Sequence, residues 1–220
     1  MQESHNDLVL TFEKALVDFD GPNVIRKNYE DILSRLKKIE FETKKKLFIF
    51  DLNGILIEKE YVPDFSIKRE GWARVGKSLC RPYDITIELF KILFSDDGKN
   101  FCHVGIWTSA YTSNLIKMVK GCFPQYEKEF LFLWGQEQCK SEPNPRFIKD
   151  DKECKEKPIL FWKEIYKVWG EFPQYNETNT VIIDDSEQKL ENNPPECCKC
   201  LTNDQIEDFK EDLKLIIKYS

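Results

Sequence analysis

The sequence predicts an α/β fold with a doubly wound parallel sheet, because three apolar, β-rich runs alternate with helical segments. The run 47–50 is apolar throughout and ends in Asp51, which is typical of a strand buried on both faces. Two later runs of the same kind end at Thr108 and at Asp184. Apolar residues at helical spacing separate these runs, as in parallel sheets with crossover helices.

The composition fits one globular domain with an extension. The 220 residues, 41% of them hydrophobic, are enough to bury a core. The net charge of −6 argues against general nucleic-acid binding, because no basic excess exists to displace counterions. No apolar run approaches a membrane span, and the first residues lack a secretory signal pattern. We expect an intracellular protein, cytoplasmic or nuclear, with mitochondria as the alternative.

Residues 1–44 are predicted to form an N-terminal helical extension ahead of the main domain, 45–220. Apolar residues recur at helical spacing over 8–20 and 25–39. The sequence Gly21-Pro22-Asn23 between them favours a turn. The extension is therefore expected to be a helical hairpin.

The main domain is expected to contain five strands and four helices, with three irregular segments. The strands are predicted at 47–50, 101–106, 130–134, 180–186 and 196–201. Helices are predicted at 83–95, 159–169 and 203–218, and Lys163 lies inside the second of these. A fourth helix is predicted to run through Val119 from a cap at Ser109 or Thr112. The irregular segments are a flap or hairpin insertion at 57–82, a turn at Asp96-Asp97-Gly98 and a loop at 135–157.

Cys197-Cys198-Lys199-Cys200 has two interpretations. It could bind zinc, but no second Cys or His pair stands at zinc-site spacing, and the chain has only two histidines. Free cysteine also packs as a small hydrophobic residue. We favour a short strand here.

Polar side chains follow several of the predicted strands. Asp51, Thr108 and the pair Asp184 and Asp185 stand at the carboxyl ends of strands, which converge on one crevice in a doubly wound sheet. Asp51 and an acid after the fourth strand could share a Mg²⁺ ion, which prefers carboxylates, water and phosphate. Thr108 could donate to a phosphoryl oxygen, and Lys163 could neutralise its charge. The set outlines a phosphoryl-transfer site.

The order of these motifs resembles the haloacid dehalogenase superfamily. Within it, the chain is similar to the NLI-interacting-factor-like (FCP/SCP-type) phosphatase domain, in the branch that carries Asp-Leu-Asn-Gly in its first motif. The resemblance rests on Asp51-Leu52-Asn53-Gly54, Trp107-Thr108-Ser109-Ala110, Lys163, Asp184-Asp185-Ser186 and Asn193-Pro194-Pro195. The resemblance is strongest over about residues 45–202, which is the part of the chain that it covers. It implies a Mg²⁺-dependent phosphatase that acts on phosphoserine in proteins or on a small phosphate ester.

The resemblance also implies roles for the individual residues. Asp51 would be the nucleophile that forms an aspartyl-phosphate. The phosphoryl group would be bound by Thr108, Ser109 and Lys163. The Mg²⁺ would be held by Asp51, Asp184, Asp185 and the backbone carbonyl of Asn53.

Asn53 departs from the active pattern. In active relatives this position is an acid that protonates the leaving group and then activates water, and an amide can do neither. General acid–base catalysis is typically worth about 10²–10⁴-fold. The sequence therefore leaves two functions open. One is a slow phosphatase; the other is an inactive pseudophosphatase that serves as a scaffold or receptor subunit, as in the relative that acts in mitochondrial import. A phosphoprotein or another protein is the expected partner, and the oligomeric state stays open.

Lys163, Lys157, Arg81 and His103 also have a structural interpretation beside the functional one. Lys163 and the nearby Lys157 could each be solvated surface lysines. Arg81 is expected to form an ion pair rather than to contact phosphate. His103, next to an apolar strand position, is expected to be a structural histidine with a hydrogen-bond partner.

Overall fold

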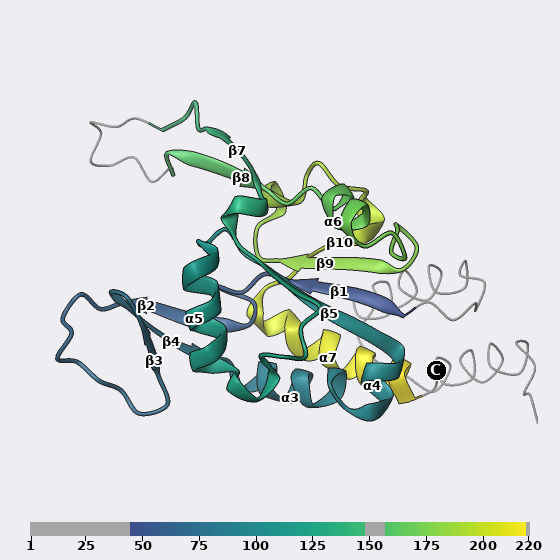
Figure 1. Cartoon of the computed structure of the whole chain (residues 1–220), viewed down its shortest axis with the longest axis horizontal. Coiled ribbons are helices and arrows are strands. Elements are labelled where there is room, and N and C mark those ends of the chain that lie inside the picture. The colour runs from purple at the N-terminus through teal and green to yellow at the C-terminus, as the bar shows by residue number, and fades with distance from the viewer. Residues whose placement is uncertain (1–44, 148–156, 219–220) are drawn as a thin grey trace, which may run out of the picture.

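The computed structural model describes residues 45–147 and 157–218, so the predicted helices at 8–20 and 25–39 lie outside the described residues. Its centre is a five-stranded parallel sheet with the strand order β10-β9-β1-β5-β6 (Figure 1). The strands are β1 (Lys46–Phe50), β5 (Cys102–Trp107), β6 (Phe132–Trp134), β9 (Thr180–Asp184) and β10 (Cys198–Cys200). All five lie where the sequence predicts strands.

Helices cover both faces of this sheet, which confirms the doubly wound α/β class. They are α3 (Asp84–Leu93), α4 (Asp96–Phe101), α5 (Thr112–Cys122), α6 (Tyr166–Glu171) and α7 (Asn203–Lys218). Side chains alternate along β1, so that Phe48 and Phe50 pack with α3, α5 and α7 in one core. Leu47 and Ile49 pack with Val168 of α6 in the other. In Figure 1, α6 lies on one side of the sheet, opposite α3 and α7.

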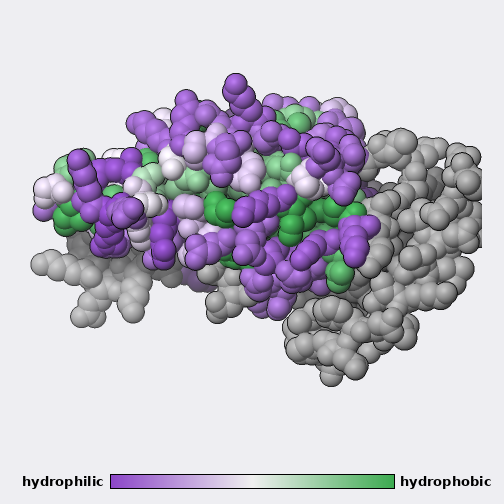
Figure 2. All heavy atoms as spheres, turned by 90° about the horizontal axis from the view of Figure 1, so that it is seen from below, coloured by the Kyte–Doolittle hydropathy of each residue, from purple (hydrophilic) through white to green (hydrophobic). Residues whose placement is uncertain are grey.

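The segment 57–82 is a flap, as predicted. It forms an antiparallel sheet in which β4 (Ser78–Pro82) lies between β2 (Ile57–Tyr61) and β3 (Ala73–Val75). Phe65 and Ile67 on this flap are exposed, and Figure 2 shows hydrophobic side chains among hydrophilic ones at the end where the flap lies.

A second hairpin replaces two predicted elements. Residues expected to form a loop include β7 (Lys140–Pro143), and the expected helix at 159–169 begins instead as β8 (Ile159–Trp162), which pairs with β7. The helix prediction is wrong because a short apolar run has no periodicity that separates strand from helix. Only α6, four residues after β8, is helical. Lys163 therefore follows a strand and is not inside a helix.

Two predicted helix boundaries are also wrong. Asp96-Asp97-Gly98 begins α4 and is not a turn, because the Ser95 hydroxyl accepts a hydrogen bond from the Gly98 amide at 3.0 Å and caps the helix. Neither Ser109 nor Thr112 caps α5, whose cap position is Tyr111. The carboxylate of Glu137 accepts the Thr112 amide instead, at 3.1 Å.

Both hairpins project from the same end of the molecule, next to the carboxyl ends of the parallel strands (Figure 1). The flap leaves the sheet soon after β1 and returns to α3, and the β7–β8 hairpin lies between β6 and β9 in the chain. Side chains at these strand ends are thus flanked by two projecting elements. Within the described ranges, no helix is long and apolar enough to span a membrane.

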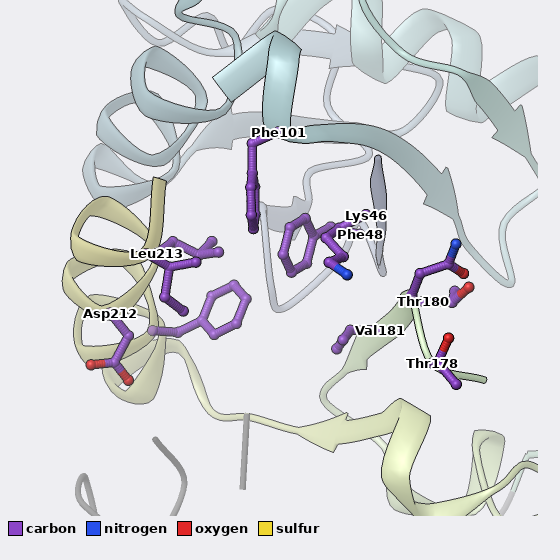
Figure 3. Close-up of a pocket in the computed structure, with 11 residues that line it drawn as sticks. Lys46, Phe48, Phe101, Thr178, Thr180, Val181, Asp212 and Leu213 are labelled. Carbon is purple, nitrogen blue, oxygen red and sulfur yellow. The ribbon is translucent and has the colours of Figure 1, made fainter. Parts of the chain in front are cut away.

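The amino ends of β1 and β9 border an apolar pocket. Its apolar lining comes from the sheet, from the end of α4 and from α7, and consists of Phe48, Phe101, Val181, Phe209, Leu213 and Ile216. Figure 3 shows Phe48 and Leu213 facing one another across it, with Lys46 and Asp212 at its borders. Burial lowers the pKa of Lys46 to about 8 and raises that of Asp212 to about 7.

Candidate functional site

Asp51 stands at the carboxyl end of the central strand of the sheet. Its amide donates to the Ile183 carbonyl at 2.8 Å, which continues the pairing of β1 with β9 by one residue. The next residue, Leu52, is fully buried and anchors the turn, so the Asp51 side chain is only 2% exposed. A buried carboxylate at this position faces the crevice in which α/β sheets bind ligands.

Lys163 joins Asp51 to the neighbouring strand end. Its ammonium lies 2.7 Å from Asp51 Oδ1 and 2.5 Å from Asp184 Oδ2, and all three side chains are buried. The structure thus brings together three residues that the sequence analysis selected from segments far apart in the chain. The alternative of a solvated surface lysine applies to Lys157, which is exposed, and is excluded for Lys163.

The backbone around Lys163 is held by residues that follow β9. The Lys163 amide donates to the Lys189 carbonyl at 2.8 Å. The buried side chain of Asn193 donates to the Lys163 carbonyl at 2.7 Å and accepts the Ile165 amide at 2.7 Å. These three bonds fix the irregular segment between β8 and α6, so that the ammonium enters the site from a rigid backbone.

Lys189 is the site residue that sequence reasoning missed. Its ammonium lies 2.8 Å from Asp184 Oδ1, 3.3 Å from Asp185 Oδ1 and 3.8 Å from Asp51 Oδ2. One signal in the sequence could have found it, because Lys189 stands four residues after Asp185, a spacing that places two side chains on one face of a helical turn.

The buried charges shift one another. Burial raises the pKa of Asp51 above its ordinary value, against the lowering effect of Lys163. Burial acts in the same direction on Asp184, but Lys163 and Lys189 outweigh it and hold the pKa of Asp184 below its ordinary value. Burial alone would lower the pKa of Lys189, but Asp51 and Asp184 raise it. Asp184 and Lys189 therefore form a fixed ion pair, and Asp51 is the carboxylate whose charge is easiest to change.

Thr108, Ser109 and Asn53 form the other side of the site. Thr108 follows β5 and is fully buried, and Ser109 after it is partly exposed. The Asn53 amide group lies 3.4 Å from Thr108 Oγ1, at the limit of a hydrogen bond. Asn53 Oδ1 is a buried oxygen that accepts no hydrogen bond from the described residues. It can accept a bond from a ligand but cannot supply a proton.

The candidate metal ligands form one group. Single oxygens of Asp51, Asp184 and Asp185 all lie within 4.8 Å of one another, as a hard cation requires. Gly54 allows this approach: its φ of 88° suits glycine, and a Cβ there would lie 2.4 Å from Asp185 Oδ2. The Lys189 ammonium, however, already lies against all three carboxylates. The arrangement therefore suits an ammonium, and does not fit Mg²⁺ unless Lys189 moves.

Other candidates have structural roles. His103 forms a hydrogen bond with the Tyr175 hydroxyl, and Arg81 forms an ion pair with Glu58 at 2.8 Å. Trp107 and Trp134 are buried in the core. Cys198 to Cys200 form β10, as predicted, and Asp51, Asp184 and Asp185 are the only metal-binding group found among the described residues.

Comparisons with known proteins give structural neighbours alone. No family model and no curated protein matches the chain. Two solved structures resemble it, a variant of the fission yeast RNA polymerase II CTD phosphatase Fcp1 bound to beryllium fluoride and the structure of Fcp1, an essential RNA polymerase II CTD phosphatase. Their TM-scores are both 0.41, at 14% and 15% identity. The matches cover 86% and 88% of this chain but 54% and 53% of those proteins, so the chain spans about half the length of each.

Proposed function

We propose that this chain is a phosphatase-fold protein of the haloacid dehalogenase type, which binds a phosphoryl group at Asp51 and hydrolyses it slowly. The observation that carries the proposal is the buried Lys163 ammonium, which bonds the carboxylates at the ends of two adjacent strands. A lysine and a strand-end carboxylate held in this way supply a nucleophile and a neutralising charge together. Thr108, at the end of the strand on the other side of β1, adds a hydroxyl donor.

The first chemical step uses these residues alone. An Asp51 oxygen attacks phosphorus, the bond from phosphorus to the leaving oxygen breaks, and the electron pair departs with the leaving group. Lys163 and Lys189 neutralise charge on the phosphoryl oxygens and on the carboxylates around them. Thr108 donates to a phosphoryl oxygen. No step is assigned to Mg²⁺, because Lys189 stands where the ion would bind.

Proton transfer is what the site lacks. The leaving oxygen needs a proton, and the water that later attacks the aspartyl-phosphate must lose one. Asn53 can provide neither transfer, although its unpartnered Oδ1 can accept a bond from either group. Substrates with good leaving groups, such as aryl or acyl phosphates, need little protonation. We therefore expect the site to favour them over phosphoserine.

The substitution Asn53→Asp tests the proposal. Restoring an acid at this position should raise kcat for p-nitrophenyl phosphate by about 10²–10⁴-fold, with a smaller gain for acetyl phosphate, whose leaving group is better. Adding Asp51→Asn to that variant should abolish the gain. Assays are run with and without Mg²⁺. Asn100→Asp, which makes the same change on the surface, is the control and should leave the rate unchanged.

The proposal fails if Asn53→Asp does not turn over either substrate and Asp51 is not labelled by acetyl phosphate in any variant. Labelling is measured by the mass of the intact protein after rapid acid quench. Labelling without turnover in the unmodified chain would support the first step and place the defect in hydrolysis.

A second candidate function is binding without catalysis, and exposed aromatic side chains favour it. Tyr61, Phe65, Tyr111 and Tyr166 are all more than half exposed. The first two lie on the flap, Tyr111 directly precedes α5, and Tyr166 begins α6. Exposed aromatics are typical of protein-binding surfaces. This function predicts that a phosphoserine peptide binds without turnover, and that Tyr61→Ser with Phe65→Ser weakens binding. Ile116→Ser, exposed on α5, is the matched control.

A further inference from the structure

The Lys189 ammonium lies against the three carboxylates that could together bind a cation. The three carboxylates of Asp51, Asp184 and Asp185 form a group of the size that holds one cation. The Lys189 ammonium lies within 4 Å of an oxygen of each of them, and it is 2.8 Å from the closest. A cation that bound all three carboxylates would need the same space.

The position of Lys189 is fixed by its backbone as well as by its charge. It ends a short 3₁₀ helix, Glu187–Lys189, in which its amide donates to the Ser186 carbonyl at 3.1 Å. Its carbonyl accepts the Lys163 amide, so the two lysines of the site are joined through the main chain. Leu190, the next residue, is buried in the core. The side chain therefore enters the site from an anchored segment and is only 14% exposed.

With Lys189 in place, the site offers poor coordination for a divalent ion. The carboxylates of Asp51, Asp184 and Asp185 face the ammonium groups of Lys163 and Lys189, so only one net negative charge remains, less than the two charges of Mg²⁺. Mg²⁺ also prefers oxygen ligands at about 2.0–2.1 Å in octahedral geometry, and Lys189 lies against the carboxylates that would supply them. Mg²⁺ would have to bind within a few ångströms of Lys189, and like charges at such distances repel strongly in a buried site.

We propose that Lys189 is the resident cation of this site, and that its ammonium takes the place of a divalent metal, so that anion binding at Asp51 requires no Mg²⁺. The inference rests on the proposed function for the identity of the anion, a phosphoryl group. It concerns the cation alone, however, and a direct metal titration tests it whether or not the chain is a phosphatase.

The first experiment titrates the whole chain with Mn²⁺, a hard divalent ion that electron paramagnetic resonance detects. The unmodified chain should show no binding at millimolar Mn²⁺. Lys189→Met removes the charge, keeps a similar side-chain length, and should tighten Mn²⁺ binding at least about a hundredfold. Lys91→Met, on the surface of α3, should behave as the unmodified chain. Micromolar Mn²⁺ binding by the unmodified chain overturns the proposal, and this result needs no variant to fold.

Two further measurements cover a variant that does not fold and separate the two proposals. Lys189→Gln is titrated beside Lys189→Met, and absence of any gain in both folded variants overturns the proposal. Beryllofluoride binding in metal-free buffer is followed by fluorine resonance, with Asp51→Asn as control. Binding by the unmodified chain, lost in Asp51→Asn, supports both proposals. If beryllofluoride does not bind although Lys189→Met gains Mn²⁺, the phosphoryl site fails and the role of Lys189 as resident cation stands.

Discussion

The two ends of the central sheet bury ionisable side chains in opposite ways. At the carboxyl end, Asp51 and Asp184 are buried against the ammonium groups of Lys163 and Lys189, so that charge meets opposite charge. At the amino end, Asp212 lies beside an apolar pocket, and the charges acting on it are those of Asp208 and Glu211, which have the same sign. Buried carboxylates therefore face opposite charge at the carboxyl end, which holds the pKa of Asp184 below its ordinary value, and like charge at the amino end, which adds to the raised pKa of Asp212.

This difference shows what makes a buried carboxylate a candidate site. Burial, with a smaller contribution from Asp208 and Glu211, raises the pKa of Asp212 to about 7, and no opposite charge is among the causes of this shift. Convergence of several strand ends supplies paired, fixed charges, which can stabilise charge on a bound ligand. The predictions below test whether the carboxyl end depends on pairing and the amino end on apolar packing.

The largest expected effect on stability comes from Lys163→Met. It keeps much of the side-chain volume but leaves Asp51 and Asp184 facing each other with less compensating charge. Breaking a buried ion pair from one side costs about 3–5 kcal/mol. Urea unfolding should show a loss of this size. Lys117→Met, exposed on α5, should stay within about 0.5 kcal/mol of the unmodified chain. A loss in Lys163→Met no larger than that of the control would show that pairing does not hold this end together.

At the amino end, the corresponding change is Phe209→Ala. Phe209 packs edge-on against Phe48 and Phe50, with ring centroids 6.1 and 6.3 Å away. Its removal should cost about 3 kcal/mol, the low end for phenylalanine, because the side chain borders an existing pocket. Phe65→Ala on the flap, where the ring is exposed, should cost under about 1 kcal/mol. Equal losses in the two variants would contradict the packing role of the amino end.

The turn after β1 gives a smaller effect. Gly54→Ala places a Cβ 2.4 Å from Asp185 Oδ2 at a φ of 88°, so it should cost about 1–2 kcal/mol and displace the Asp185 carboxylate. Gly71→Ala is a matched control, because its φ is also positive, 75°, but a Cβ there meets nothing within 4 Å. The difference in unfolding free energy between the two variants isolates the contact with Asp185. Equal unfolding free energies for the two variants would show that the Asp185 carboxylate can move away from the new Cβ without a cost in stability.

The sequence predicted the sheet better than it predicted the connections. The central strands β1 and β9 are apolar runs, and burial on both faces leaves a strong compositional signal there. Lys163 shows where this reasoning stops. Its segment, 159–169, has apolar residues that fit either period, and pairing with β7, a long-range contact, decides that it starts as a strand. The structure places Lys163 against Asp51 and Asp184 although its predicted secondary structure was wrong, because the motif order indicated the residue independently of the helix prediction.

Lys189 could not be predicted in the same way. Asp51, Thr108 and Asp184 each end a strand, so sheet topology places them together without knowledge of side-chain directions. Lys189 enters from a 3₁₀ helix whose orientation depends on the bond from Lys163 to its carbonyl and on Leu190 in the core. The spacing of four residues from Asp185 links Lys189 to one carboxylate, but it does not show that the segment turns toward Asp51 and Asp184.

The smallest expected effect is a pH dependence at the amino end. The pKa of Asp212 is raised from 3.8 to about 7, first by burial and then by Asp208 and Glu211. The folded state therefore holds a proton that the unfolded state has lost. Stability from this group is fully present below pH 3.8 and is lost as the pH rises through about 7. The free energy of unfolding of the unmodified chain should accordingly fall over this range.

Asp212→Asn removes the titrating group and should remove that fall, so the difference between variant and unmodified chain should change by at least about 1 kcal/mol between acidic and mildly alkaline buffer. The direction of this change is the informative result: the free energy of unfolding of Asp212→Asn must increase relative to that of the unmodified chain as the pH rises. Asp97→Asn, exposed on α4, should give no such trend. If the free energy of unfolding of Asp212→Asn instead falls relative to that of the unmodified chain at alkaline pH, the Asp212 carboxylate is stabilised by an opposite charge. The amino end would then bury charge in the same way as the carboxyl end.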